Sequence, residues 1–268
     1  MDAQQQLRRK YAGKTIVVTG ATSGNGQALA NLLLALGAVV IGLGRNVARL
    51  AELECRGGIP YQLDLSDFAA IDEFVTWFDL HYERCDGLFH LAGTTLVGEA
   101  GAAEFQAFKA ADLDGPVRLA EGFLSTMNRG ATVAMVSSIA AAVPEAHGLR
   151  QYAEVKGAVA SWCGQNRARF TASGANLMLI AMGAIATNVG RSAGLGGAFN
   201  RAAEMLLPPP ERYSPQILKD AAAGKPASFP GRFASLTTYQ NGTCQVRVGR
   251  KALVLALEAG VWFAHLGK

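Results

Sequence analysis

Charged side chains are scarce in this sequence. Aspartate, glutamate, lysine and arginine make up 17% of its 268 residues, whereas hydrophobic residues make up 50%. Such a composition excludes an intrinsically disordered chain and supplies ample material for a buried core, and the length suits one large domain. The net charge is only +4, and basic residues are scattered except at residues 8–10. We therefore expect no nucleic-acid partner.

Cysteines and long apolar runs are also lacking. The four cysteines show neither metal-ligand spacing nor a Cys-x-x-Cys pair, so we expect no metal site and reduced thiols. No apolar run approaches the ~20 residues of a membrane span. Residues 1–14 lack the apolar core of a secretory signal. These absences predict a cytoplasmic protein that does not enter a membrane.

The sequence does contain a regular alternation of short apolar runs and helix-length segments. Continuous apolar runs are typical of strands buried on both faces of a parallel sheet. They occur at residues 15–19, 38–43, 61–65, 87–93, 131–138 and 175–182. The longest helical segment is expected at 104–127. This order predicts an α/β fold, a Rossmann-like doubly wound parallel sheet in a single domain (1–268), with ligands at the carboxyl ends of the strands.

The alternation ends after residue 182. Residues 188–240 are rich in glycine, alanine and proline, and a long irregular insertion in a compact domain is more often a functional lid than a linker. Its mostly apolar side chains predict a mostly uncharged substrate. Residues 241–268 predict a last strand, 244–249, and a C-terminal helix. That helix could lie on a membrane surface, but packing on the sheet or on a second subunit is favoured.

Three glycines follow the first apolar run directly. Gly20, Gly24 and Gly26 stand between the first expected strand and the first expected helix. Glycine permits a tight turn and lets a pyrophosphate approach the backbone, while the helix N-terminus offers unpaired N–H groups. In this context the glycines predict a dinucleotide site. The alternative is an ordinary structural turn.

The spacing Gly-x-x-x-Gly-x-Gly, preceded by Thr19, resembles the variant found in the short-chain dehydrogenase/reductase family. Further motifs follow in the family's order over about residues 13–190. They are "LAG" at 91–93, "SS" at 137–138, Tyr-x-x-x-Lys at 152–156 and "MGAIAT" at 182–187. Each motif alone is weak, but several in register are specific together. The resemblance implies a nicotinamide cofactor, with residues 13–190 as the cofactor-binding and catalytic core.

The resemblance also implies which residues contact that cofactor. Asp64 would meet the adenine amino group, and the backbone near Ile185 with the hydroxyl of Thr187 would hold the carboxamide. The remaining expected contacts lie in the glycine turn, after the strands and on the helix expected at residues 151–162. They are Gly20, Thr22, Ser23, Gly24, Asn25, Gly26, Leu65, Ala92, Gly93, Tyr152, Lys156 and Gly183.

Gly44 and Arg45, at the end of the second expected strand, bear on the choice between NAD and NADP. A carboxylate at this point binds the ribose 2′-hydroxyl of NAD but repels the 2′-phosphate of NADP, which a guanidinium suits. Gly44 occupies the place where NAD-preferring relatives carry an acid. We therefore expect NADP(H), with an Arg45 that points to solvent as the alternative.

Tyr152 and Lys156 share a helix face because they are four positions apart. A free tyrosine has a pKa of ~10, and a nearby ammonium lowers it. The spacing also occurs in many ordinary helices, but the other motifs favour a proton-transfer pair. The resemblance implies Tyr152 as general acid/base, Lys156 as its tuner and ribose ligand, and Ser138 as the group that polarises the substrate oxygen.

Asp112 is the main departure from the family pattern. Relatives carry an asparagine here, which binds a water that links the active-site lysine to solvent. An aspartate could accept the same hydrogen bonds, could ion-pair with Lys156, or could mark altered activity, so Asp112 is the fourth expected catalytic residue. Leu91 and Met182 also replace family residues. His90 is more simply explained as a structural histidine at a strand end.

Together these patterns predict an NADP(H)-dependent oxidoreductase. It would reduce a ketone or aldehyde, or oxidise the matching secondary alcohol, by hydride transfer with a tyrosine as proton donor or acceptor. Relatives pair their fourth and fifth helices, so a homodimer or homotetramer is expected. Two alternatives stay open: a non-catalytic NADP(H)-binding sensor or scaffold, and an epimerase or dehydratase of the same family.

Overall fold

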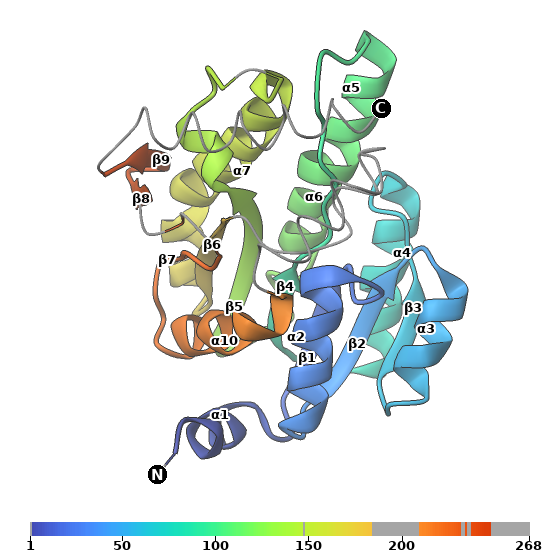
Figure 1. Cartoon of the computed structure of the whole chain (residues 1–268). Helices are drawn as coiled ribbons and strands as arrows, with labels where there is room; N and C mark the ends of the chain where they lie inside the picture. The colour runs from blue at the N-terminus through green and yellow to red at the C-terminus, as the bar shows by residue number, and fades with distance from the viewer. Residues whose placement is uncertain (1, 147, 184–208, 232–233, 235–236, 248–268) are drawn as a thin grey trace.

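A seven-stranded parallel sheet forms the centre of the computed structural model, which describes residues 2–146, 148–183, 209–231, 234 and 237–247 (Figure 1). The strand order is β3-β2-β1-β4-β5-β6-β7. Six strands overlap the six expected apolar runs, although β3 shares only residues 61–62 with the run expected at 61–65. They are β1 (Thr15–Thr19), β2 (Val39–Gly44), β3 (Ile59–Gln62), β4 (Cys85–His90), β5 (Met127–Ser138) and β6 (Asn176–Met182). The predicted Rossmann-like fold is confirmed. The chain order reverses between β1 and β4, where ligands of such sheets bind.

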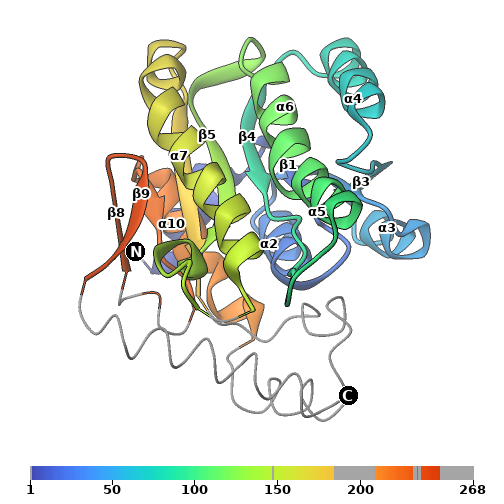
Figure 2. The ribbon, with the colours of Figure 1, turned by 90° about the horizontal axis from the view of Figure 1, so that it is seen from above.

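Helices cover both faces of the sheet. Successive strand residues point to opposite sides, so each face presents apolar side chains that a layer of helices buries. Val17 and Leu88 belong to one core with α4 (Phe68–His81), α6 (Gly115–Gly122) and α7 (Arg150–Ala172). Val18 and Phe89 belong to the opposite core, which four helices cover. These are α1 (Ala3–Tyr11), α2 (Gly24–Ala35), α3 (Val47–Glu54) and α10 (Ser214–Ala222). Figure 2 shows the two helical layers from above.

The helix expected at 104–127 is interrupted. It consists of α5 (Ala102–Lys109), a π-helical turn η1 (Ala110–Asp114) and α6. Pro116, in the first turn of α6, has no N–H to donate to the carbonyl of residue 112, which explains a wider turn there. The helix also packs tightly at this point, since a Cβ at Gly115 would collide with the Leu65 carbonyl oxygen. The turn thereby carries Asp112 to the carboxyl edge of the sheet.

The segment expected as an irregular lid contains regular structure where it is described. After a short 3-10 turn, η3 (Pro210–Arg212), the chain forms α10 and the last sheet strand, β7 (Ala227–Ser228). α10 joins the main body: Tyr11 Oη donates to the Leu218 carbonyl at 2.7 Å. Pro215 lies in the first turn of α10, where a missing N–H costs no hydrogen bond. Pro215 therefore lies at the start of α10 and does not disrupt it. A lid stays a prediction for residues 188–208, which lie outside the described residues.

The strand expected at 244–249 is present but pairs elsewhere. It corresponds to β9 (Thr243–Val246), which forms an antiparallel hairpin with β8 (Thr237–Gln240) and is not part of the parallel sheet. The hairpin lies on α7, where Tyr239 Oη donates to the Ala160 carbonyl at 2.8 Å. The predicted C-terminal helix lies outside the described residues. Among the helices that are described, none has the length and apolar character of a membrane span.

Candidate active site

The turn between β1 and α2 forms a backbone cradle. Gly20 has φ +69°, in the left-handed region that favours glycine. A Cβ at Gly26 would lie 2.3 Å from the Gly20 carbonyl oxygen, so a side chain there would push the helix away from the turn. α2 begins at Gly24, and its first N–H groups face the cradle without partners in the helix. The turn thus provides N–H donors and positive dipole charge suited to a phosphate.

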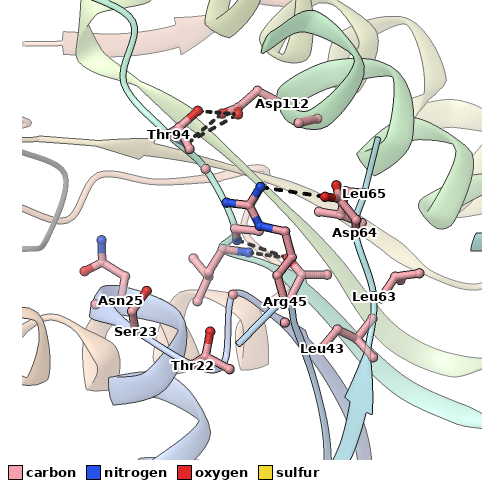
Figure 3. Close-up of a pocket in the computed structure, with 18 residues that line it drawn as sticks. Thr22, Ser23, Asn25, Leu43, Arg45, Leu63, Asp64, Leu65, Thr94 and Asp112 are labelled. Atoms are coloured by element: carbon pink, nitrogen blue, oxygen red, sulfur yellow. Dashed lines mark hydrogen bonds and ion pairs between the residues drawn. The ribbon is translucent and has the colours of Figure 1, made fainter. Parts of the chain in front are cut away.

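A pocket opens above this cradle at the carboxyl ends of β1, β2 and β4 (Figure 3). Eleven of the predicted site residues line it: Gly20, Thr22, Ser23, Gly24, Asn25, Arg45, Asp64, Leu65, Ala92, Gly93 and Asp112. Gly26 supports the cradle from below. Lys156 adjoins the pocket, because a Cβ added to Gly93 would lie 3.4 Å from its Nζ. Ile185 and Thr187 lie outside the described residues, and Gly183 follows the end of β6.

Sequence reasoning missed several lining residues. They are Leu43, Leu63, Thr94 and Ala111; Thr19, Gly44 and Leu91, which belong to the motifs read from the sequence, also line the pocket. Thr94 is the most informative, because it binds Asp112. Its position directly after the "LAG" turn, at the edge where ligands bind, was the available signal.

Thr19 ties β1 to β4. Its Oγ1 accepts from the backbone N–H groups of Leu91 at 3.1 Å and Ala92 at 3.0 Å, and lies 2.8 Å from His90 Nδ1. Since two N–H groups already donate to this oxygen, its hydroxyl donates to Nδ1, and the ring proton of His90 is on Nε2. Burial and the nearby charge of Lys156 lower the pKa of His90 to about 3. His90 is therefore a neutral structural link.

The two serines at the end of β5 have different partners. Ser137 Oγ donates to the Lys156 carbonyl at 2.7 Å, so this hydroxyl fastens α7 to the sheet. Ser138 Oγ accepts from the N–H of Ala140 at 3.2 Å, which leaves its hydroxyl proton available to another acceptor. These contacts favour Ser138, which was also the sequence-based choice, as the serine that faces a substrate.

Tyr152 and Lys156 lie one turn apart near the start of α7. Lys156 Nζ is 5.8 Å from the centroid of the Tyr152 ring. The ring is half-buried and packs against Phe108, with 6.1 Å between the two ring centroids. The ammonium therefore lies on the same face of α7 as the phenol.

Asp112 ion-pairs with Lys156. Its Oδ1 accepts from Nζ at 2.7 Å, and both side chains are only 2% exposed. The same carboxylate accepts from the Thr94 N–H at 3.2 and 3.3 Å and from the Thr94 hydroxyl at 3.0 Å (Figure 3). Burial lowers the pKa of Lys156, but the charge of Asp112, the Tyr152 phenol and the hydrogen bond from Nζ outweigh it, so the pKa is raised. Of the three sequence-based possibilities for Asp112, the ion pair is the one the structure shows.

Arg45 and Asp64 face each other across the outer end of the pocket, with 3.7 Å between Nη1 and Oδ2 (Figure 3). Asp64 Oδ1 also accepts from the N–H of Ser66 at 2.9 Å and from its hydroxyl at 2.8 Å. Partial burial raises the pKa of Asp64, but the Ser66 hydrogen bonds and the Arg45 charge prevail and lower it. Arg45 is 69% exposed, so its guanidinium can reach a ligand.

The fold and this cradle define a dinucleotide-binding α/β protein with a lysine beside its pocket and a tyrosine one helical turn from that lysine. Residues 14–195 match the short chain dehydrogenase family. The chain belongs to this family. Proteins of this family are oxidoreductases that use a nicotinamide cofactor.

Individual relatives agree with this assignment. The chain is 33% identical over 130 residues to a coniferyl-alcohol dehydrogenase of Pseudomonas sp. (strain HR199 / DSM 7063), a match that covers 48% of this chain and 46% of that protein, less than half its length. It is 25% identical over 242 residues to the Drosophila melanogaster dehydrogenase/reductase SDR family protein 7-like, covering 80% and 72%. A short-chain dehydrogenase structure from Streptomyces avermitilis superposes with a TM-score of 0.71 at 25% identity, covering 83% and 89%.

Proposed function

We propose that this protein is an NADP(H)-dependent carbonyl reductase, or the alcohol dehydrogenase of the reverse reaction. The observation that carries the proposal is the position of Tyr152 and Lys156. They stand on one helix, with Lys156 Nζ beside Gly93 at the inner end of the pocket. A phenol next to an ammonium, beside a phosphate-binding cradle, is suited to proton transfer coupled to hydride transfer.

The residues present fit a nicotinamide dinucleotide. A bound cofactor would give a hydride to a carbonyl carbon or take one from an alcohol. Gly20, Ser23 and the α2 N-terminus would hold its pyrophosphate, because the first N–H groups of α2 have no partners within the helix. Lys156 would bind the ribose next to the nicotinamide, and Asp64 would bind the adenine. Gly183, Ile185 and Thr187 are proposed for the carboxamide end.

Packing around Gly44 supports NADP(H) over NAD(H). A Cβ at position 44 would lie 2.6 Å from Thr22 Cγ2, so no acidic side chain fits there without moving a stiff β-branched neighbour. Arg45 follows, and Arg49 Nη1 donates to the Thr22 carbonyl at 3.3 Å. Two guanidinium groups therefore flank the turn where a 2′-phosphate would lie.

Arg45→Asp is expected to weaken NADPH binding by about 10- to 100-fold and to leave NADH binding much less affected. Loss of a charge-assisted hydrogen bond and gain of repulsion both act on the 2′-phosphate alone. Fluorescence titration with both cofactors measures the change. Arg56→Asp is the matched control, because Arg56 is exposed and its Nη1 donates to Asn31. An unchanged NADPH/NADH preference in Arg45→Asp would refute the assignment.

Three side chains would carry the proton chemistry. Ser138 would donate its hydroxyl proton to the substrate oxygen and stabilise the charge that develops on it. Tyr152 would give its phenolic proton to that oxygen in reduction, or take the alcohol proton in oxidation. Lys156 would orient the ribose and supply the nearby charge. Asp112 would influence this chemistry indirectly, through its ion pair with Lys156.

The remaining features of the proposal concern substrate, assembly and location. We propose a small, mostly apolar carbonyl or alcohol as substrate. The alcohol named for the Pseudomonas relative is consistent with that class. A homodimer or homotetramer in the cytoplasm completes the proposal, with α6 and α7 as the paired helices.

NADPH consumption against a panel of ketones, aldehydes and quinones tests the proposal. Turnover of at least one carbonyl, with formation of the matching alcohol, is expected. The specific alternative is a non-catalytic NADP(H) sensor, favoured by one observation: Asp112 already engages Lys156. Saturable NADPH binding without turnover of any carbonyl would support that alternative.

A further inference from the structure

The buried ion pair of Asp112 and Lys156 determines the charge next to Tyr152. Both partners are 98% buried in their side chains, and Oδ1 and Nζ are 2.7 Å apart. The carboxylate is fixed from the other side by the N–H and hydroxyl of Thr94. Because three donors hold it in place, Asp112 cannot turn away from Lys156 without leaving a buried charge without partners.

An ammonium promotes ionisation of a neighbouring phenol by its net positive potential. Lys156 Nζ is 5.8 Å from the centroid of the Tyr152 ring, but the same Nζ lies only 2.7 Å from Oδ1 of the Asp112 carboxylate. The two charges sum to zero, so the potential that reaches the phenol is that of a dipole. A phenolate at Tyr152 therefore receives much less stabilisation than a lone lysine would provide.

In the described part of the chain, no other group near Lys156 supplies the positive charge that Asp112 neutralises. Two titratable groups act on Lys156 besides Asp112: Tyr152 from α7 and His90 from β4. His90 is fully buried and neutral, with Nδ1 bonded to the Thr19 hydroxyl. The polar neighbours Ser137 and Thr94 are uncharged. Within the described part of the chain, Asp112 thus determines the net charge behind the phenol.

We propose that Asp112 is a positioning residue that keeps Tyr152 as a neutral phenol, the form that donates the proton in carbonyl reduction, up to a more alkaline pH than an unpaired Lys156 would allow. The inference rests on the proposed function. In reduction the carbonyl carbon accepts a hydride with its two electrons, and the carbonyl oxygen accepts the Tyr152 proton. The alcohol leaves, and the phenolate recovers a proton from water. Oxidation starts from the phenolate, so both directions depend on the pH at which Tyr152 ionises.

Asp112→Asn removes the charge and keeps the shape. The amide oxygen still accepts from Lys156 Nζ, and the amide nitrogen can donate to the Thr94 hydroxyl oxygen. We expect the ultraviolet tyrosinate transition of Tyr152 to move to lower pH by about one unit or more in the cofactor-free protein. The alkaline limb of kcat for reduction and the acid limb of kcat for alcohol oxidation should move to lower pH by the same amount. Subtracting the Tyr152→Phe titration, measured in each background, isolates this one tyrosine.

Asp114→Asn is the matched control. Asp114 lies in the same π-helical turn and pairs with Lys109 at 2.7 Å, but both side chains are more than a third exposed. The same charge change there is screened by water and should leave the transition of Tyr152 in place. Asp112→Ser provides a second, smaller uncharged variant if the asparagine variant is poorly folded.

The two readouts separate the inference from the proposed function. A Tyr152 transition that stays in place in Asp112→Asn and Asp112→Ser, or that moves equally in Asp114→Asn, overturns the inference even if carbonyls are reduced. A shift to lower pH in a protein that turns over no carbonyl supports the electrostatic role of Asp112. That result would overturn the proposed reaction and, with it, the role of Asp112 in carbonyl reduction.

Discussion

Tyr152→Phe is expected to lower kcat for carbonyl reduction by about 10²- to 10⁴-fold, the usual contribution of a positioned general acid. The substitution removes only the hydroxyl. The ring keeps its packing against Phe108, with the 6.1 Å centroid separation available to phenylalanine as well. NADPH affinity should therefore change little. The measurement is the rate of NADPH consumption with the best substrate of the panel, together with a binding titration.

Tyr239→Phe provides a control in which another hydroxyl that contacts α7 is lost. Tyr239 Oη donates to the Ala160 carbonyl at 2.8 Å, on the side of α7 that faces the hairpin. Its removal should cost about 1 kcal/mol of stability and leave kcat unchanged. If Tyr152→Phe retains the parent kcat, Tyr152 is not the proton donor, and the proposed chemistry fails.

Lys156→Met is expected to reduce the free energy of unfolding by about 3–5 kcal/mol, because it leaves the Asp112 carboxylate buried without its cation. The double variant Asp112→Asn with Lys156→Met should recover much of this loss, since no isolated charge remains. The two substitutions are therefore expected to be strongly non-additive. Urea unfolding of the parent, the two single variants and the double variant measures the coupling.

The surface pair of Lys109 and Asp114 is the control for this cycle. Lys109→Met should change stability by about 0–1 kcal/mol, because its partner remains hydrated. A Lys156→Met variant as stable as the parent would contradict the buried pair.

The same pair has a defined pH dependence. The pKa of Lys156 is raised in the folded protein above its ordinary 10.5. Its contribution to stability is therefore fully present below pH 10.5 and is lost as the pH rises through the higher folded value.

Much of the fold could be predicted from residues that are close together in the sequence. The apolar runs that form β1 and β6 are continuous because both faces of these strands are buried. The glycines at 20, 24 and 26 mark the cradle because its geometry depends on missing Cβ atoms a few residues apart. Tyr152 and Lys156 share a face because one helical turn separates them. Each of these signals is local, so the sequence alone was sufficient.

Other features could not be read in this way. The prolines near residues 208–215 predicted irregular chain, yet Pro215 lies in the first turn of α10, which packs on the sheet. Residues 244–246 were recognised as a strand, but their partner is β8 and not the sheet. A helix start and a strand partner are decided by what the segment can pack against, which lies far away in the sequence.

The sequence by itself determined the parallel α/β core and the cradle. It also indicated four candidate catalytic residues, Ser138, Tyr152, Lys156 and Asp112. Tertiary structure alone decided how Asp112 acts. Lys156 is 44 positions away from it, and only the π-helical turn before Pro116 and the packing of α7 on β5 bring the two side chains to 2.7 Å. A buried charge takes its effect from the few atoms around it, and those atoms come from β4, η1 and α7 together.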